Sequence, residues 1–174
     1  VNIADSVHST YFDHFTKIGN ISIKEENIKS YFKGDDFKKL YSENNTPLHS
    51  FPISYRINNS KSVSDPIDLK AENLTTRWHN IISRNGEIER IHNLFDDINV
   101  HVKQIVLSNY ASSLSVLNEM ESSLGAISID IGKIKTLLSF TLDNQLIHFE
   151  TICLGSFNFT KDLSNVLSID INEA

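Results

Sequence analysis

Cysteine is almost missing from this sequence of 174 residues, which holds only Cys153. A single cysteine cannot form an intrachain disulfide, so the composition gives no support for an oxidising compartment. The neighbours Ile152 and Leu154 predict a buried thiol. Because a nucleophilic cysteine must be accessible to its substrate, we interpret Cys153 as a structural residue, even though His148 lies only five positions before it.

Motifs that bind phosphates or metals are also missing. The six glycines are scattered and form no phosphate-binding loop, no GxSxG motif is present, and no two of the seven histidines lie three or four positions apart. We therefore predict no catalytic residues, no cofactor, no metal and no small-molecule ligand. An enzyme or toxin whose site is assembled by tertiary folding, for example around His79, His92 and His101, stays open as an alternative.

The sequence also lacks an excess of positive charge. Lysine and arginine number 16 against 22 acidic residues, giving a net charge of -6, which argues against nucleic acid as a partner. No apolar run approaches the roughly 20 residues that span a bilayer, and the first 20 residues lack the apolar core of a signal peptide. A membrane partner is thus not expected. We expect a cytoplasmic protein, or one secreted by a route without a cleaved apolar signal peptide.

What the sequence does contain is enough apolar and aromatic residues, 40% and 9%, for a folded domain. Helical spacing of apolar residues from Val7 to Ile18 predicts a first helix over residues 6–18. A capping box at Ser22 predicts a second over about residues 23–33, and an aspartate cap at residue 35 or 36 predicts a third. The segment 1–45 is therefore predicted to be a unit of short helices.

The middle of the chain has a different character. All three prolines fall between residues 46 and 73, together with a polar tract, and this segment is predicted to be a linker or loop with a possible edge strand at Phe51–Ile57. Residues 74–174 are predicted to form a helical bundle, packed with 1–45 into one compact domain. Its first helix would carry Trp78, Ile81 and Ile82.

Two runs of apolar residues follow at alternating intervals of three and four, from Ile88 to Ile105 and from Leu117 to Leu138. This is the heptad spacing of packed helices. The two runs differ in phase across a serine-rich junction at residues 108–115, which indicates either one long helix with a stutter or a turn between two helices. We favour the turn. The predicted fold is all-α, a helical bundle with a long antiparallel helical hairpin and short N-terminal helices.

Heptad positions bury well only against a facing helix, so the second run is also a candidate surface for a partner. The candidate partner-binding residues are Leu117, Met120, Leu124, Ile127, Ile131 and Ile134. The partner would be another helical protein or a second copy of the chain. The residue usage is typical of AT-rich bacterial genes, and we predict a non-enzymatic interaction protein such as a secreted virulence effector or a secretion-system component. A membrane-active helical protein is a further alternative.

Overall fold

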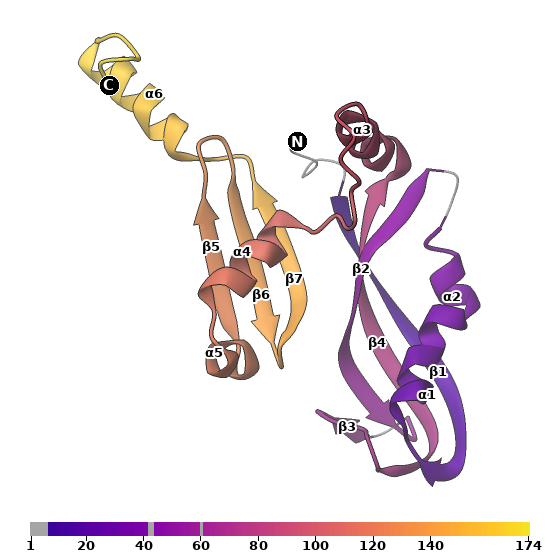
Figure 1. The fold of residues 1–174 in the computed structure, drawn as a ribbon. Helices are drawn as coiled ribbons and strands as arrows, with labels where there is room; N and C mark the ends of the chain where they lie inside the picture. The colour runs from indigo at the N-terminus through magenta and orange to yellow at the C-terminus, as the bar shows by residue number, and fades with distance from the viewer. Residues whose placement is uncertain (1–6, 42–43, 60) are drawn as a thin grey trace. The chain divides into compact units, whose positions relative to one another are not determined.

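The computed structural model describes residues 7–41, 44–59 and 61–174. Two compact units make up the chain, Val1–Val106 and Leu107–Ala174, and each is described by itself. Both units contain antiparallel sheets as well as helices (Figure 1). The predicted all-α bundle is wrong, and the fold is mixed α/β.

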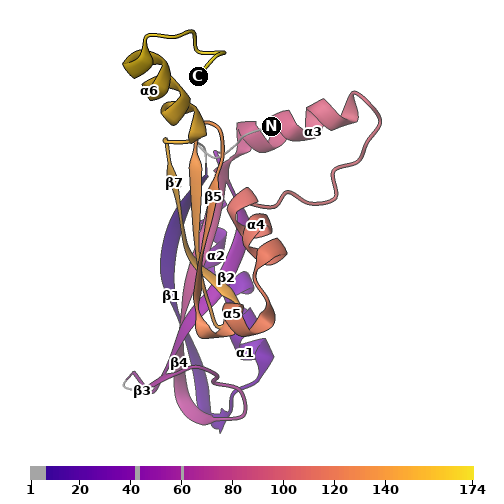
Figure 2. The ribbon, with the colours of Figure 1, turned by 90° about the vertical axis from the view of Figure 1, so that its left-hand side faces the viewer.

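The first unit is built on a four-stranded antiparallel sheet. Its strands are β1 (Val7–Ser22), β2 (Asn45–Ile57), β3 (Lys61–Val63) and β4 (Lys70–Arg84). They lie in the order β1-β4-β2-β3, so β1 and β3 form the two edges (Figure 2). The two longest strands, β1 and β4, are neighbours in this order.

Strand β4 occupies the segment that the sequence predicted to be a helix around Trp78. Trp78, Ile81 and Ile82 are all buried. Adjacent apolar residues such as Ile81 and Ile82 point to opposite faces of a strand, so both bury only in an interior strand covered on both sides. The spacing three and four apart that mimicked a helix arises from this double burial, which explains the wrong prediction.

Strand β1 replaces the helix predicted over residues 6–18. It pairs with β4 from Val7, opposite Ser83, to Lys17, opposite Asn73. The register then shifts, and within the shift Gly19 and Asn20 take the left-handed backbone conformation, with φ of 80° and 65°. Intervals of four are even, so residues spaced four apart share a strand face as readily as a helix face.

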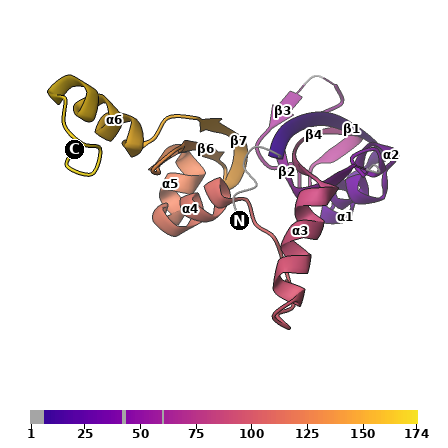
Figure 3. The same ribbon diagram turned by 90° about the horizontal axis from the view of Figure 1, so that it is seen from above.

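The two later short helices of the N-terminal segment are present. They are α1 (Glu25–Lys29), which continues as the 3-10 helix η1 (Ser30–Lys33), and α2 (Asp35–Lys38). Together they cover one face of the sheet (Figure 3). The helices are present, but the predicted caps are wrong: Ser22 ends β1, α1 begins after Lys24, and Gly34 precedes Asp35 at the start of α2.

Tyr31 of η1 lies at the centre of the hydrophobic core that the helices form with this face of the sheet. Its ring stacks on Trp78 with 4.4 Å between centroids, and its hydroxyl donates a hydrogen bond to Asn80 Oδ1 at 2.9 Å. Burial raises the pKa of Tyr31 to about 12, and the nearby Asp36 carboxylate adds to this rise. The helical layer is thereby fastened to the middle of β4.

The segment 46–73, predicted to be a linker, contributes β2 and β3 to this sheet. β3 pairs with β2 only at Tyr55–Ile57, so within the described residues the rest of β2 has β4 as its one strand neighbour, and the predicted edge strand at Phe51–Ile57 is interior only at its end. Pro47 and Pro52 each coincide with a register shift against β4. Proline lacks the N–H that a ladder needs, so it is tolerated at such irregularities.

The first heptad run is helical only in its first half. Helix α3 (Asn85–Asp96) carries Ile88, Ile91 and Phe95 and ends three residues before Asn99, which takes a positive φ of 56°. From residue 100 to residue 107 the chain has no regular secondary structure. The heptad spacing therefore predicted a helix that continues past the true end of α3.

The second unit holds a three-stranded antiparallel sheet with strand order β5-β6-β7. Its elements are α4 (Ser108–Val116), α5 (Glu119–Leu124), β5 (Ala126–Ile131), β6 (Thr136–Leu142), β7 (Gln145–Ile152) and α6 (Ser156–Leu167). Helices α4 and α5 lie on one face of this sheet (Figure 3). In the described ranges, no helix has both the length and the apolarity to cross a membrane.

The predicted long helical hairpin is therefore wrong. The second heptad run passes through α5, β5 and β6, and the helical part stops at Gly125, whose φ of 106° is closed to most L side chains. The junction at residues 108–115, where a turn was expected, is instead the helix α4. The chain does turn sharply between β6 and β7, where Asp143 and Asn144 both have positive φ, as a two-residue hairpin requires.

Candidate protein-interaction surface

An unpartnered row of isoleucines lies on β5. Ile127, Ile129 and Ile131 alternate along the strand and are 60%, 61% and 64% exposed. The residues between them, Ser128 and Asp130, point to the opposite face, because successive side chains of a strand alternate. β5 is at the edge of its sheet, which adds a free strand edge to the apolar row.

The row continues across the sheet onto the neighbouring strands. On β6, Phe140 pairs with Ile127 and Leu138 pairs with Ile129, while on β7 the outward residue Ile152 is 38% exposed. We call this surface the isoleucine face; it comprises Ile127, Ile129, Ile131, Leu138, Phe140 and Ile152. On the same face Thr136 lies between Ile131 and Ile152, and β7 carries His148 and Glu150, so the apolar part is concentrated on β5 and β6. An exposed apolar patch of this kind is typical of a protein-interaction site.

The opposite face of the same sheet is closed by α4. The Asn109 side chain donates hydrogen bonds to the carbonyl oxygens of Leu138 and Glu150, each at 3.3 Å. Ser139 donates to the Asn109 carbonyl oxygen at 3.0 Å, and Ser112 donates to Asp130 Oδ2 at 3.1 Å. These contacts fix which side of the sheet is packed and which side is open.

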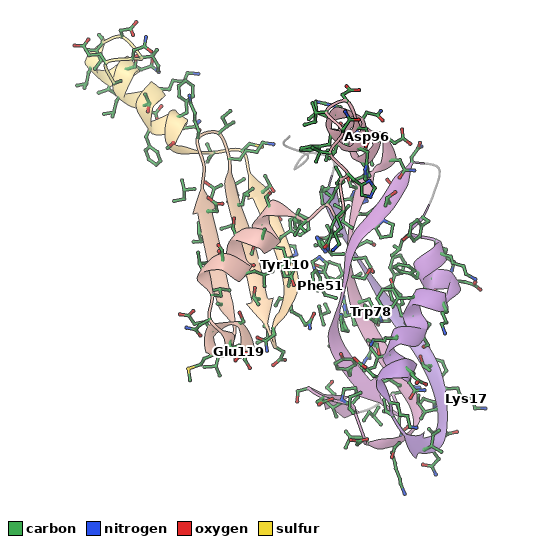
Figure 4. The ribbon with its side chains drawn as sticks, in the orientation of Figure 1. Lys17, Phe51, Trp78, Asp96, Tyr110 and Glu119 are labelled. Carbon is green, nitrogen blue, oxygen red and sulfur yellow. The ribbon has the colours of Figure 1, made fainter. Side chains whose placement is uncertain are left out.

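The structure distributes the six predicted partner-binding residues over helix α5, strand β5 and the connections beside them. Ile127 and Ile131 belong to the isoleucine face, whereas Ile134 lies in the turn between β5 and β6 and is 66% exposed. Met120 and Leu124 of α5 line a shallow hollow together with Asn144, and Leu117 follows the end of α4. Figure 4 labels Glu119 beside this hollow. Their role in binding a partner stays a prediction.

Sequence reasoning missed Ile129, which lies between two of the chosen residues. The heptad spacing selects Ile127 and Ile131 and passes over the residue midway between them. Strict alternation of apolar and polar residues from Ile127 to Ile131 is the signal that would have found it.

Cys153 does not occupy the buried position that its neighbours predicted. The thiol is free and exposed, just after β7. Its predicted imidazole neighbour, His148, instead lies 3.6 Å from a carboxylate oxygen of Glu150. Apolar neighbours in the sequence did not predict burial here, because the strand end leaves its flanking side chains in solvent.

A serine, a histidine and an aspartate meet in the first unit, which no spacing in the sequence indicated. Ser30 Oγ lies 3.4 Å from His14 Nε2, and His14 Nδ1 lies 3.5 Å from Asp36 Oδ2. The Ser30 hydroxyl, however, donates to the Asn27 carbonyl oxygen at 2.6 Å. Its proton is thus committed to the helix, and we interpret the group as a link between β1 and the helical layer.

A metal site needs several ligand side chains close together. Among the residues that the structure describes, no three histidine, cysteine or acidic side chains gather in a way that could hold a metal ion. The adjacent acids Asp35 and Asp36 open α2 and pair with Lys38 and Lys39, each at 3.3 Å. These carboxylates lie in the first turn of α2, where negative charge stabilises a helix.

Comparison with protein families relates the chain to cell division. Residues 4–82 match the family described as the SHS2 domain inserted in FtsA, a match confined to the first unit. Cell division protein FtsA of Agrobacterium fabrum is 29% identical over 127 residues, which cover 73% of this chain and 29% of that protein. FtsA of Rhizobium meliloti is 23% identical over all of this chain and 39% of its own length, and FtsA of Neisseria meningitidis serogroup B is 30% identical over 69% of this chain and 29% of its own. The chain thus spans well under half the length of these relatives.

A comparison of folds gives a match to a solved structure. A chain of a PilM-PilN type IV pilus biogenesis complex matches 98% of this chain, over 46% of its own length, with a TM-score of 0.54 and 9% sequence identity. At that identity the likeness concerns the fold alone. It supports the mixed α/β architecture against the predicted bundle.

These relatives correct the predicted function. The roles as a secreted virulence effector, a secretion-system component or a membrane-active helical protein are wrong, because the matched relatives are cell division proteins. The predicted seam of packed helices is also wrong, since the candidate residues lie on α5, on β5 and in the connections beside them, whereas their role in binding a partner stays a prediction. The alternative of an enzyme or toxin gains no support from the relatives.

Proposed function

We propose that the protein carrying this chain acts in bacterial cell division, in the cytoplasm, as an FtsA-like component that works by binding other proteins. The observation that supports this most is the match of residues 4–82 to the SHS2 domain of FtsA. FtsA relatives whose similarity spans the chain from end to end add weight, because the likeness then includes the second unit.

The isoleucine face is our candidate for one of the binding surfaces. Three isoleucines at 60% or more exposure sit on a sheet whose other side is fastened by α4. Burying such side chains gives roughly 1.5–3 kcal/mol each when a partner covers them fully. The proposed occupant is another protein of the division machinery, and Met120, Leu124 and Ile134 extend the same proposal to the elements beside the sheet.

A localisation experiment tests the proposed role. In the source bacterium, a fluorescent fusion of the protein that carries this chain is expected to gather at the site where cells constrict. Fluorescence spread evenly through dividing cells would contradict the proposal.

A matched pair of variants tests the proposed surface. Ile129→Asp places a charge at the centre of the isoleucine face and is expected to disperse the fusion from the constriction site. Val166→Asp makes the same kind of change on α6, at a residue that is 81% exposed, and is expected to leave the localisation intact. Thermal unfolding of both variants checks that the fold survives. Equal behaviour of two folded variants would refute the role of this face.

A further inference from the structure

Strand β1 is a long edge without a neighbour on its outer side. It runs for 16 residues from Val7 to Ser22, and in the described part of the chain β4 is the one strand that pairs with it (Figure 2). An edge of this kind exposes a row of backbone N–H and C=O groups that can pair with another strand. Natural edges are usually short, or blocked by proline or several charges, yet β1 contains no proline and only Lys17 among lysines and arginines.

Three residues on one face of β1 carry complementary features. Asp13, Phe15 and Lys17 alternate along the strand, and Phe15 is 54% exposed. Lys17 is exposed at the outer margin of the sheet and forms no ion pair within the described part of the chain (Figure 4). Asp13 pairs with Arg56 at 3.1 Å but keeps 42% of its side chain exposed. An acid, an aromatic ring and a base thus follow one another along a free edge.

We propose that β1 pairs antiparallel with β1 of a second copy of this chain, about a two-fold axis at Phe15. Residues directly opposite each other in such a pair have their side chains on the same face, with Cβ atoms about 4.5–5.5 Å apart. Phe15 then meets Phe15 of the second copy. Asp13 lies opposite the second copy's Lys17, and the symmetry forms this pair twice.

The charges select this register over its neighbours. An axis at Asp13 would set two carboxylates opposite each other, and an axis at Lys17 would set two ammonium groups together; both arrangements are repulsive. An axis at Phe12 would give a longer ladder but would leave Asp13 and Lys17 without charged partners. The register shift after Lys17 also ends regular pairing there, so the proposed ladder covers about five residues on each strand.

Charge exchange tests the proposed pairing, in an Arg56→Gln background that removes the ion pair between Arg56 and Asp13 and leaves Arg77, opposite Asp13 on β4, the same in every variant. Self-association of the whole chain is measured by light scattering and sedimentation across a concentration series. Lys17→Asp is expected to weaken the dimer at least tenfold, and the double variant Asp13→Lys with Lys17→Asp is expected to restore it. The control Lys33→Asp makes the same change on η1 and should leave the dimer unchanged.

The same series can refute the proposal. A chain that stays monomeric up to its highest soluble concentration would overturn it, and so would a dimer that Lys17→Asp leaves intact. A double variant that fails to regain association while remaining folded would also count against it.

Disulfide trapping tests the register independently. In a Cys153→Ser background, Phe15→Cys is expected to cross-link two copies, because opposed Cα atoms at 4.5–5.5 Å fall within the range that a disulfide accepts. Phe12→Cys and Ser22→Cys are expected to stay monomeric. Cross-linking at residue 12 in place of residue 15 would overturn the register. The proposal does not rest on the role in cell division, since neither assay uses a cell.

Discussion

Tyr31 joins the helical layer of the first unit to β4, so its removal should be measurable in two ways. Its side chain is fully buried, stacks on Trp78 and donates a hydrogen bond to Asn80 Oδ1. In Tyr31→Phe the ring and its stacking remain and only the hydroxyl is lost. Because Asn80 Oδ1 also accepts from Ser50 at 2.7 Å, no acceptor is left empty. We expect a loss of about 1 kcal/mol in the free energy of unfolding at neutral pH.

The second effect depends on pH. Burial, reinforced by the Asp36 carboxylate, raises the pKa of Tyr31 from 10.0 to about 12. A raised pKa means that the folded state holds the proton more tightly than the unfolded state. The contribution is therefore complete below pH 10 and is lost as the pH rises from 10 to about 12, by an amount on the order of 2–3 kcal/mol.

The assay is urea unfolding of the wild-type chain and of Tyr31→Phe at several pH values between 8 and about 11.5. The wild-type stability should fall more steeply than that of the variant above pH 10, so that the difference between them shrinks and then changes sign. Tyr41→Phe, at a tyrosine that is 55% exposed, serves as the control and should follow the wild type. Identical alkaline slopes for the wild type and Tyr31→Phe would refute this reasoning.

Three further predictions concern the second unit. Gly155→Ala would place a Cβ 2.5 Å from the backbone of Gly132 and Lys133, so we expect hydrogen exchange at the start of α6 to accelerate at least tenfold; unchanged protection would contradict that close approach. Asn109→Ala removes two side-chain hydrogen bonds to sheet carbonyl groups and should cost about 1–3 kcal/mol in urea unfolding, whereas a neutral effect would show that α4 is not held in this way. Cys153 should react with a thiol reagent in the folded chain as fast as in urea, and protection in the folded state would restore the buried thiol that the sequence predicted.

Local signals in the sequence predicted local structure well. The short helices predicted over about residues 23–33 and after residue 35 or 36 are present as α1 with η1 and as α2, although their N-caps are Lys24 and Gly34 and not the predicted residues. Caps and short helical faces depend on residues within a few positions of each other. Such elements can be predicted without knowing what the chain packs against.

The strands could not be recognised from the sequence, because an apolar spacing typical of a helix can also occur on one face of a strand. An interval of four places residues on one face of a helix and also on one face of a strand, so Val7, Tyr11 and Phe15 fit both. Burial on both faces of β4 added an apolar pair at Ile81 and Ile82 that imitates a helical stripe. Only the partner strand distinguishes these alternatives, and that partner lies some 70 positions away in the chain.

The sequence predicted part of the candidate surface. The exposed residues Ile127 and Ile131 were chosen for a helical reason, and the structure places them on a strand with Ile129 between them. β-Branched residues in strict alternation favour a strand, and giving this preference more weight than the heptad spacing would have identified the whole row. Which side of the sheet is covered could not be predicted, because α4 reaches it through hydrogen bonds from Asn109 to backbone groups of β6 and β7.

The most direct test of the proposed role is cell length after depletion of the protein that carries this chain in its own bacterium. We predict long, undivided cells that regain normal length when the wild-type protein is supplied, and that stay long with Ile129→Asp present at the same level. Cells that keep dividing at normal length after depletion would contradict the proposed role in cell division.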